Sequence, residues 1–164
     1  MTSPPDLLPL EDFSGDWETY VEELYSIFIK EIARAGILFR NQEVSCLRHP
    51  ETKGRWKSFW HFIQEGTIEE GRTPDFRRCE RLRWIPWVIN NAGTHPEIDE
   101  WLNKRKAETN ALLWYREEYL VVLSQKKGFW LLKTAYSTER NHTIRKLRRE
   151  RDNFYKISGK AKKS

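Results

Sequence analysis

YLVVLSQKKGFWLLKTAY, residues 119–136, is the stretch that decides the fold. Its two halves, 119–124 and 129–136, are rich in the β-branched and aromatic residues that are typical of strands. Between them lies Gln125-Lys126-Lys127-Gly128, a polar segment that ends in glycine and predicts a hairpin turn. A tight hairpin joins antiparallel neighbours, so the sequence predicts an antiparallel sheet.

The segments on either side supply helices. Apolar residues at helical spacing predict a helix over 17–35, with Asp16 as N-cap and Gly36 as its stop. A second helix is expected over 139–155. A third should open at Pro74-Asp75 and end near residues 84–86, because the residue before a proline resists helical geometry.

Further strands are expected at 44–50, 56–63 and 112–115, with a turn at 51–55 and a loop from Gly66 to Pro74. Residues 97–106 are compatible with a short helix or with irregular structure. The expected fold class is α+β, an antiparallel sheet with N-terminal, middle and C-terminal helices packed against it.

Length predicts a single domain, because the chain has 164 residues. Residues 1–15 are rich in proline and acidic residues and predict an extended arm. Residues 16–157 form the expected domain, and 158–164 a disordered basic tail. Aromatic residues make up 13% of the chain, with eight Trp. Such large side chains allow a small domain to bury a sufficient core.

Several classes of protein are disfavoured. No apolar run approaches the roughly 20 residues of a membrane helix, and the N-terminus lacks a signal-peptide pattern. A cytoplasmic protein with no membrane contact is therefore expected. Cys46 and Cys79 lack the spacing of a zinc site or a disulfide framework, and are expected to be buried thiols. No P-loop, GxGxxG, HExxH or GxSxG occurs, so neither a cofactor nor a metal is expected.

The positive charge is concentrated at one end of the chain. The net charge is +5, and residues 139–164 hold ten Lys/Arg against three Asp/Glu. Such asymmetry favours a polyanionic partner, most commonly nucleic acid. The alternative is a solvated helix with a flexible basic tail.

Three residues in the expected strands are candidates for chemistry. Strand alternation places His61 on the face away from Trp60 and Phe62; the alternative is a satisfied core or edge histidine. Thr134 and Tyr136 are expected on one face with Leu132, and Lys133 on the other. Two neighbouring hydroxyls can donate to a phosphate, and the tyrosine ring can stack on a base. The alternative is that both are ordinary strand residues.

Two groups of basic residues are candidate phosphate contacts. The first contains Arg77, Arg78, Arg81 and Arg83, whose planar guanidinium groups can clamp a phosphorane. The second lies on the last helix, where one face carries His142, Arg145 and Arg149, with Arg148 beside them. This face predicts a track for an RNA backbone. A solvated basic surface is the alternative for both groups.

These residues resemble a known superfamily. The series FWH (59–61) with Glu65-Gly66, RRCERLRWIP (77–86), YLVVL (119–123), LLKTAY (131–136) and His142 resembles a phage- and mobile-element-associated branch of the barnase/EndoU/colicin/RelE nucleases. The likeness covers about residues 17–155. The resemblance implies an α+β fold whose concave sheet face holds RNA, and toxins or effectors that cut tRNA or other RNA.

The same resemblance implies roles for matching residues. His61 becomes the acid/base candidate, Arg81 or Arg78 the phosphate clamp, Thr134 and Tyr136 the groups from the late strand, and His142 a second titratable group. No glutamate clearly matches the general base of barnase. A neutralising immunity or antitoxin protein is an expected companion.

The expected function is therefore a metal-independent endoribonuclease. RNA carries its own nucleophile, the 2′-hydroxyl, so the protein must supply a base, an acid and a cation, and the product is a 2′,3′-cyclic phosphate. A non-catalytic RNA-binding or regulatory module is the alternative. A protein-interaction module whose basic end meets an acidic partner is the third hypothesis.

Overall fold

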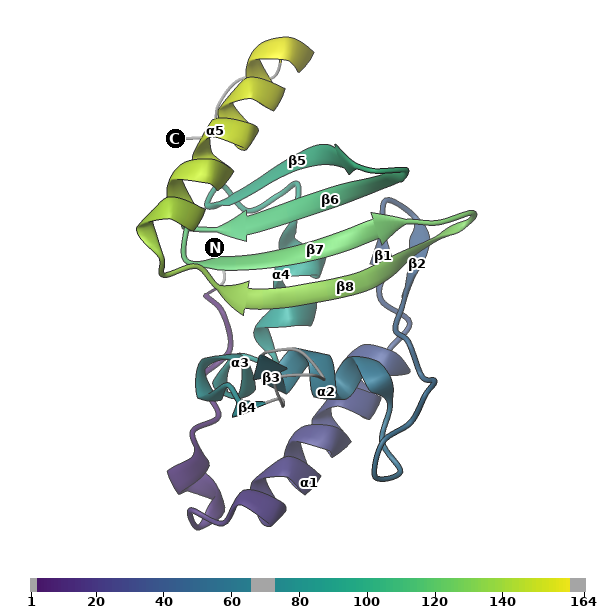
Figure 1. The fold of residues 1–164 in the computed structure, drawn as a ribbon, viewed down its shortest axis with the longest axis vertical. Helices are drawn as coiled ribbons and strands as arrows, with labels where there is room; N and C mark the ends of the chain where they lie inside the picture. Colours follow the sequence, from purple (N-terminus) through teal and green to yellow (C-terminus); the bar gives the residue numbers. More distant parts are fainter. Residues whose placement is uncertain (1–2, 66–72, 160–164) are drawn as a thin grey trace.

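The computed structural model describes residues 3–65 and 73–159, which fold into a curled six-stranded sheet with helices packed against it (Figure 1). This α+β architecture confirms the predicted fold class. The described helices are η1 (Leu10–Phe13), α1 (Trp17–Phe28), η2 (Ile29–Ala33), α2 (Lys57–Ile63), α3 (Phe76–Glu80), α4 (Trp84–Asn91) and α5 (Asn141–Ser158). The described strands are β1 (Leu38–Phe39), β2 (Gln42–Ser45), β3 (Gln64–Glu65), β4 (Thr73–Pro74), β5 (Ile98–Arg105), β6 (Glu108–Tyr115), β7 (Tyr119–Gln125) and β8 (Phe129–Ser137).

The strands of the main sheet follow the order β1-β2-β8-β7-β6-β5, and β3 and β4 form a separate pair. The hairpin predicted at 119–136 is confirmed as β7 and β8, which pair antiparallel. One pairing differs from the prediction, because β2 runs parallel to β8. The long chain between these two strands makes a parallel arrangement accessible, whereas a hairpin cannot.

A β-bulge in β8 changes which side chains share a face. The register shifts between Val122 and Leu123 of β7, so that Thr134 lies opposite Val122 and Leu132 opposite Leu123. Lys133 is the extra residue, which a bulge leaves unpaired. Simple alternation therefore fails here: Leu132 packs in the core of the opposite face, while Lys133 and Thr134 line the same pocket.

Each face of the sheet packs against helices. The larger core lies between one face and the N-terminal helices, and includes Leu24 and Phe28 of α1, Phe59 of α2 and Val88 of α4. The smaller core lies on the other face under α5, where Leu147 and Tyr155 pack with strand residues such as Trp101 and Trp114. Figure 1 shows α5 crossing one end of the sheet, far from α1.

The first predicted helix is confirmed. The Asp16 carboxylate accepts a hydrogen bond of 2.9 Å from the backbone N–H of Thr19, as an N-cap does. The helix continues from α1 into the π-helical turn η2, which ends at Ala33. Gly36 follows with a φ of +68°, a conformation that glycine adopts at no steric cost.

The prediction of a strand over 56–63 is wrong, because residues 57–63 form helix α2. The buried residues of α2 are Ser58, Phe59, Phe62 and Ile63, a helical rather than an alternating pattern. Phe59 and Phe62 both pack against Phe28 of α1. Aromatic residues favour strands by propensity, and tertiary packing overrides that preference here.

The predicted helix opening at Asp75 is present but ends sooner, at Glu80, and a further helix, α4, begins at Trp84. Pro86 is the third residue of α4. The first backbone N–H groups of a helix have no intrahelical acceptor, so proline at this position loses no hydrogen bond. Pro86 therefore lies at the start of a helix and not beyond the end of one.

Residues 98–105 form strand β5, paired antiparallel with β6 over its whole length. The expectation of a helix or irregular structure over 97–106 is therefore wrong. Ile98 belongs to the larger core and Trp101 to the smaller one, so both faces of β5 are covered. A strand buried on both faces has no clean alternation for sequence analysis to detect.

The N-terminal arm is anchored to the domain. The backbone carbonyl of Leu8 accepts a hydrogen bond of 2.6 Å from the Tyr20 hydroxyl, and that of Pro5 accepts one of 2.9 Å from the Trp84 indole. At the other end, α5 includes Ser158. The predicted loop at 66–74 falls largely, and the predicted tail at 158–164 mainly, outside the described residues. Within residues 3–65 and 73–159, no helix is long and apolar enough to span a membrane.

Candidate functional site

Two neighbouring pockets meet at Tyr136 of β8, and Tyr136 and Thr143 of α5 line both of them. The first has a volume of about 510 Å³ and is called the arginine pocket here. It lies between α3, the end of β8 and the start of α5. The described residues that line it are Glu65, Pro74, Asp75, Phe76, Arg77, Arg78, Tyr136, Ser137, Thr138, Glu139, Arg140 and Thr143.

Arg78 is the most firmly held cation of the arginine pocket. Its Nε lies 3.2 Å from Oδ2 of Asp75, and its Nη1 donates a hydrogen bond of 3.0 Å to the backbone carbonyl of His61. The guanidinium carbon lies 5.6 Å from the centre of the Tyr136 ring, within the range of a cation–π interaction. Only 15% of the side chain is exposed. Arg78 therefore joins α2, α3 and β8 at one wall of the pocket.

Asp75 fixes the start of α3 and Arg78 together. Its Oδ1 accepts hydrogen bonds from the backbone N–H groups of Arg77 and Arg78, at 3.0 and 3.2 Å. Its Oδ2 is the atom that pairs with the Arg78 side chain. One carboxylate thus acts as N-cap and as counter-ion, which limits the orientations open to the guanidinium group.

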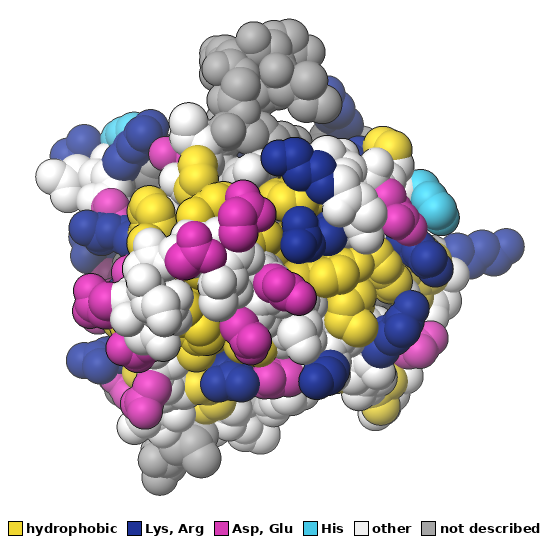
Figure 2. All heavy atoms as spheres, turned by 90° about the horizontal axis from the view of Figure 1, so that it is seen from below, with side chains coloured by type: hydrophobic (Ala, Val, Ile, Leu, Met, Phe, Trp, Pro, Cys, Tyr) yellow, Lys and Arg dark blue, Asp and Glu magenta, His cyan; other side chains and the backbone are white. Residues whose placement is uncertain are grey.

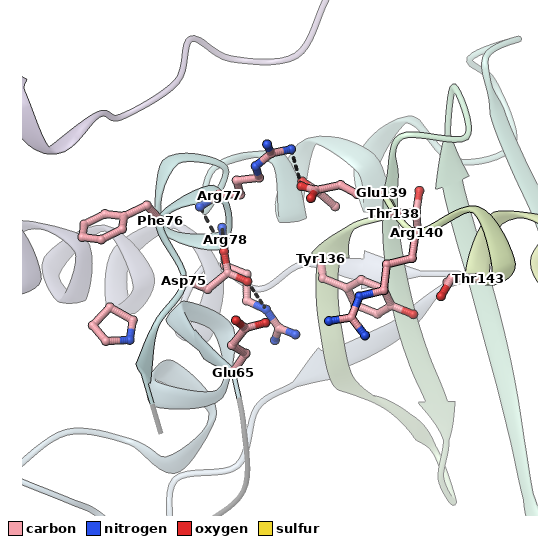
Figure 3. A pocket seen from close by; sticks show the side chains of 12 residues that line it. Glu65, Asp75, Phe76, Arg77, Arg78, Tyr136, Thr138, Glu139, Arg140 and Thr143 are labelled. Carbon is pink, nitrogen blue, oxygen red and sulfur yellow. Dashed lines mark hydrogen bonds and ion pairs between the residues drawn. The ribbon is translucent and has the colours of Figure 1, made fainter. Parts of the chain in front are cut away.

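A second guanidinium group enters the arginine pocket from the other side. Figure 3 shows the Arg140 side chain beside the ring of Tyr136, across the pocket from Arg78 and Glu65. Among the described residues, Arg140 has no carboxylate within salt-bridge distance, whereas Arg77 pairs with Glu139. Arg140 therefore contributes a positive charge that no described carboxylate neutralises.

The first turn of α5 adds to this positive character. Arg140 is its N-cap residue, no side chain caps the helix, and the first turn contains no acidic residue. Free backbone N–H groups and the helix dipole at an N-terminus favour a bound anion. Because Arg140 and Thr143 line the arginine pocket, that end of α5 borders it.

Tyr136 remains a proton donor at neutral pH. Partial burial raises the pKa of its hydroxyl above the ordinary value, although the nearby Arg78 acts in the opposite direction. A protonated phenol can donate a hydrogen bond to an anionic oxygen. Its ring also gives a base a surface on which to stack.

The second pocket, called the sheet–helix pocket here, has a volume of about 360 Å³. It lies between α5 and the face of β5 to β8 that α5 covers. The described residues that line it are Asn103, Arg105, Asn110, Leu112, Leu120, Val122, Lys133, Thr134, Tyr136, His142, Thr143, Lys146 and Leu147, and none of these is acidic. Aliphatic side chains thus share this pocket with three Lys or Arg residues.

Four of the predicted site residues line these two pockets. Arg78 and Tyr136 line the arginine pocket, and Thr134, Tyr136 and His142 line the sheet–helix pocket. Thr134 and Tyr136 share one face of β8, as predicted. The exposed His142 imidazole has its Nε2 3.5 Å from the Thr143 hydroxyl. An imidazole and a phenol thus share a pocket, but the imidazole belongs to α5.

His61 and Arg81 are not among the described residues that line either pocket. His61 lies on α2 and not on a strand, so the alternation argument for its orientation fails. The Arg81 guanidinium lies over the ring of Trp84, 5.1 Å from its centre, and 3.7 Å from Glu80. Of the two predicted clamps, the arginine that faces Tyr136 is therefore Arg78.

The basic residues of α5 divide into two groups. Arg145 and Arg149 are exposed, and no described carboxylate lies within salt-bridge distance of either. Arg148 donates hydrogen bonds of 2.9 and 2.7 Å to Glu117. Arg151, only 4% exposed, contacts Asp99 and Glu117 at 2.9 Å each. Arg148 and Arg151 therefore hold α5 on the sheet, and Arg145 and Arg149 remain accessible to a ligand.

Sequence analysis missed several pocket residues. The sequence marks Asp75 as a helix start, and a charged N-cap three residues before an arginine is the signal that could identify the pair. Arg140 is one of the ten basic residues of the C-terminal segment, and no local pattern distinguishes it from the others. Arg105 and Lys146 reach the sheet–helix pocket only through the pairing of β5 with β6 and the docking of α5. No local signal marks those two.

No cluster of three or more His, Cys, Asp or Glu residues suited to a metal ion occurs within the described ranges. Both cysteines are free thiols, and burial raises the pKa of each to about 12. A thiol with so high a pKa is a poor nucleophile at neutral pH.

The two ends of the molecule differ in charge. Exposed acidic residues gather on η1 and α1, namely Glu11, Asp12, Asp16, Glu18, Glu22 and Glu23. Figure 2 views the molecule from this lower side and shows Asp and Glu side chains together with Lys and Arg side chains around an area of hydrophobic surface. Figure 1 shows α5 at the opposite end of the molecule from η1 and α1, and residues of α5 line both pockets. The exposed residues of η1 and α1 are thus richer in negative charge than those of α5.

Comparisons with known proteins add no relative. No protein-family model matches the chain, no curated protein matches it, and no solved structure matches it.

Proposed function

We propose that this chain is a metal-independent endoribonuclease whose scissile phosphodiester binds beside Tyr136 in the arginine pocket. The observation that carries the proposal is the arrangement of Arg78. A carboxylate and a backbone carbonyl hold its guanidinium group against the Tyr136 ring, at 5.6 Å from the ring centre. A cation fixed in advance stabilises developing negative charge without reorganisation during the reaction.

The other charges around the phosphate support the same function. Arg140 and the N-terminus of α5 reach the pocket from the side opposite Arg78, so two guanidinium groups can bind one phosphodiester. Arg145 and Arg149 extend the positive surface along α5 for the rest of the RNA backbone.

The reaction needs one bond to form and one to break. The 2′-oxygen attacks phosphorus, the bond from phosphorus to the 5′-oxygen breaks, and a 2′,3′-cyclic phosphate remains. The 2′-hydroxyl proton passes to a base, and the leaving 5′-oxygen takes a proton from an acid. We assign the base to Glu65, whose carboxylate faces the arginine pocket (Figure 3), and the acid to His142 in the adjoining pocket. Tyr136 donates a hydrogen bond to the phosphate.

The expected setting follows from the substrate. An enzyme that cuts tRNA or mRNA acts in the cytoplasm, where these RNAs are. A cell that makes it needs a neutralising protein, and an acidic inhibitor that covers the arginine pocket would serve that purpose.

The test is RNA cleavage by the full chain in the presence of EDTA, with total tRNA and with mRNA as substrates. Cleavage that leaves 2′,3′-cyclic phosphate ends is expected. A substrate with 2′-O-methyl groups should bind and remain intact, because it lacks the nucleophile. No cleavage of any RNA would contradict the proposal.

A non-catalytic RNA-binding module is the second candidate. The accessible face of α5 favours it, because Arg145 and Arg149 can bind a backbone whether or not chemistry follows. Its signature is salt-dependent binding with no turnover. The same EDTA assay, read together with RNA binding, distinguishes the two functions.

A further inference from the structure

We infer that the sheet–helix pocket binds a nucleobase, namely that of the nucleotide next to the phosphate in the arginine pocket. The inference rests on the proposed function, because it assumes an RNA ligand, and it adds a base-recognition site to it. Tyr136 and Thr143 line both pockets, so a phosphate in one and its neighbouring nucleoside in the other are joined without a gap.

The apolar part of the pocket fits a base better than a second phosphate. Leu112, Leu120 and Val122 of the sheet and Leu147 of α5 provide apolar surface, and the Tyr136 ring provides an aromatic face. A volume of about 360 Å³ is in the range of small-molecule sites. Apolar walls stabilise the faces of a base, whereas a phosphate would lose hydration against them.

The rim of the pocket can recognise the edge of the base. Lys146 has no described carboxylate within salt-bridge distance, and its ammonium group can donate to a ring nitrogen or a carbonyl oxygen of the base. The Thr134 hydroxyl can either donate or accept. No acidic residue lines the pocket within the described part of the chain. The phosphates on either side of a bound base therefore meet no repulsion from the residues that line it.

A second observation points to a ligand that donates a hydrogen bond. Asn110, only 3% exposed, lines the pocket, and its Oδ1 has no hydrogen-bond partner among the described residues. Its Nδ2 donates a hydrogen bond of 3.1 Å to Oδ1 of Asn103. A buried acceptor without a donor is costly, so a base N–H that reaches Oδ1 is favoured there.

The test is a double-mutant cycle between protein and RNA. Binding of a 2′-O-methyl hexanucleotide is compared with binding of the same backbone carrying abasic residues, for wild type and for Val122→Trp, whose indole fills the pocket. Removal of the bases should weaken wild-type binding at least about fivefold, the lower bound for loss of one stacked base. In Val122→Trp the same removal should cost markedly less.

Two controls keep the outcome interpretable. Val122→Ala enlarges the pocket with less risk to folding, and circular dichroism reports whether each variant is folded. Lys127→Ala, in the β7–β8 turn, should show the same loss on base removal as wild type. Equal losses in wild type and in folded Val122→Trp would overturn the inference while the RNA-binding function stands. No RNA binding by wild type would overturn the proposed function itself.

Discussion

The guanidinium group of Arg78 lies over the ring of Tyr136, and a carboxylate from Asp75 and a carbonyl from His61 hold it there. His61 lies on α2, 17 positions from Arg78 in the chain, and Tyr136 lies on β8, 58 positions from it. Both thus meet Arg78 at one wall of the arginine pocket. The fold places a fixed cation beside a phenol, and the predictions below follow from that arrangement.

Arg78→Gln and Arg81→Gln should have different effects, although the two residues are neighbours in sequence. Arg78→Gln removes the cation beside Tyr136. It should lower kcat/KM for RNA cleavage by about 10²- to 10³-fold, as does the loss of other fixed donors to a transition state. Arg81 lies over Trp84, so its substitution should leave kcat/KM within about threefold of wild type. Steady-state cleavage of a short RNA measures both. Equal losses in the two variants would contradict the assignment of Arg78.

Asp75→Asn should separate the structural role of Asp75 from its electrostatic role. Asparagine is as good an N-cap as aspartate, so the free energy of unfolding should change by less than about 1 kcal/mol. The Arg78 guanidinium loses its charged partner and becomes less well oriented, so kcat should fall while KM changes little. Urea unfolding and single-turnover kinetics test the two parts. Unchanged stability together with unchanged kcat would show that Asp75 acts only as a cap.

The salt dependence of RNA binding should identify the phosphate contacts on α5. Arg145→Gln and Arg149→Gln should each reduce the slope of log K against log salt by about one, because each removes one phosphate contact. Arg148 donates two hydrogen bonds to Glu117, so Arg148→Gln should change the slope less. Binding titrations at several salt concentrations provide the measurement. A larger change in Arg148→Gln than in the other two would contradict this division of α5.

The buried contacts of Arg151 should dominate the docking of α5. Arg151→Ala leaves Asp99 and Glu117 without their buried partner and should destabilise the protein by about 3–5 kcal/mol. The turn before β7 presents Glu117, with a φ of +57°, toward Arg148 and Arg151. Chemical denaturation at neutral pH measures the loss, and a loss below about 1 kcal/mol would contradict the role of Arg151.

The same cluster predicts a pH dependence of stability. Hydrogen bonds from Arg148 and Arg151 lower the pKa of Glu117 below its ordinary value of 4.5, while burial acts in the opposite direction. The charged carboxylate therefore stabilises the folded state fully above about pH 4.5, and this stabilisation is lost as pH falls through the lowered pKa. Glu117→Gln should reduce the loss of stability on acidification, and Glu118→Gln is the matched exposed control. An identical acid profile for wild type and Glu117→Gln would contradict this prediction.

Much of the fold could be predicted because local signals agree with tertiary packing. The hairpin at 119–136, the N-cap at Asp16 and the C-terminal helix each combine propensity with hydrophobic spacing. Helix α2 could not be predicted, because its aromatic residues favour strands until α1 packs against them. Strand β5 is covered on both faces, which removes the alternation that identifies a strand.

The candidate site was predictable in part for a related reason. Thr134 and Tyr136 share a strand face. They are two residues apart, so strand alternation alone predicts that they lie on the same face. The bulge at Lys133 and the helical state of His61 depend on pairing and packing that no local pattern reports. Which arginine of RRCERLR faces the phenol was open in the sequence, and the early end of α3 at Glu80 turns Arg81 toward Trp84.

Tyr136→Phe tests the central claim most directly, because it removes one hydroxyl from the point where the two pockets meet and keeps the ring that packs beside Arg78. Wild type and variant are compared for cleavage of single-stranded RNA in EDTA, with the ends of the products identified. The account predicts 2′,3′-cyclic phosphate ends from wild type and a rate at least about tenfold lower for Tyr136→Phe, with RNA affinity largely retained. Unchanged cleavage by Tyr136→Phe, or RNA left intact by the wild type, would contradict it.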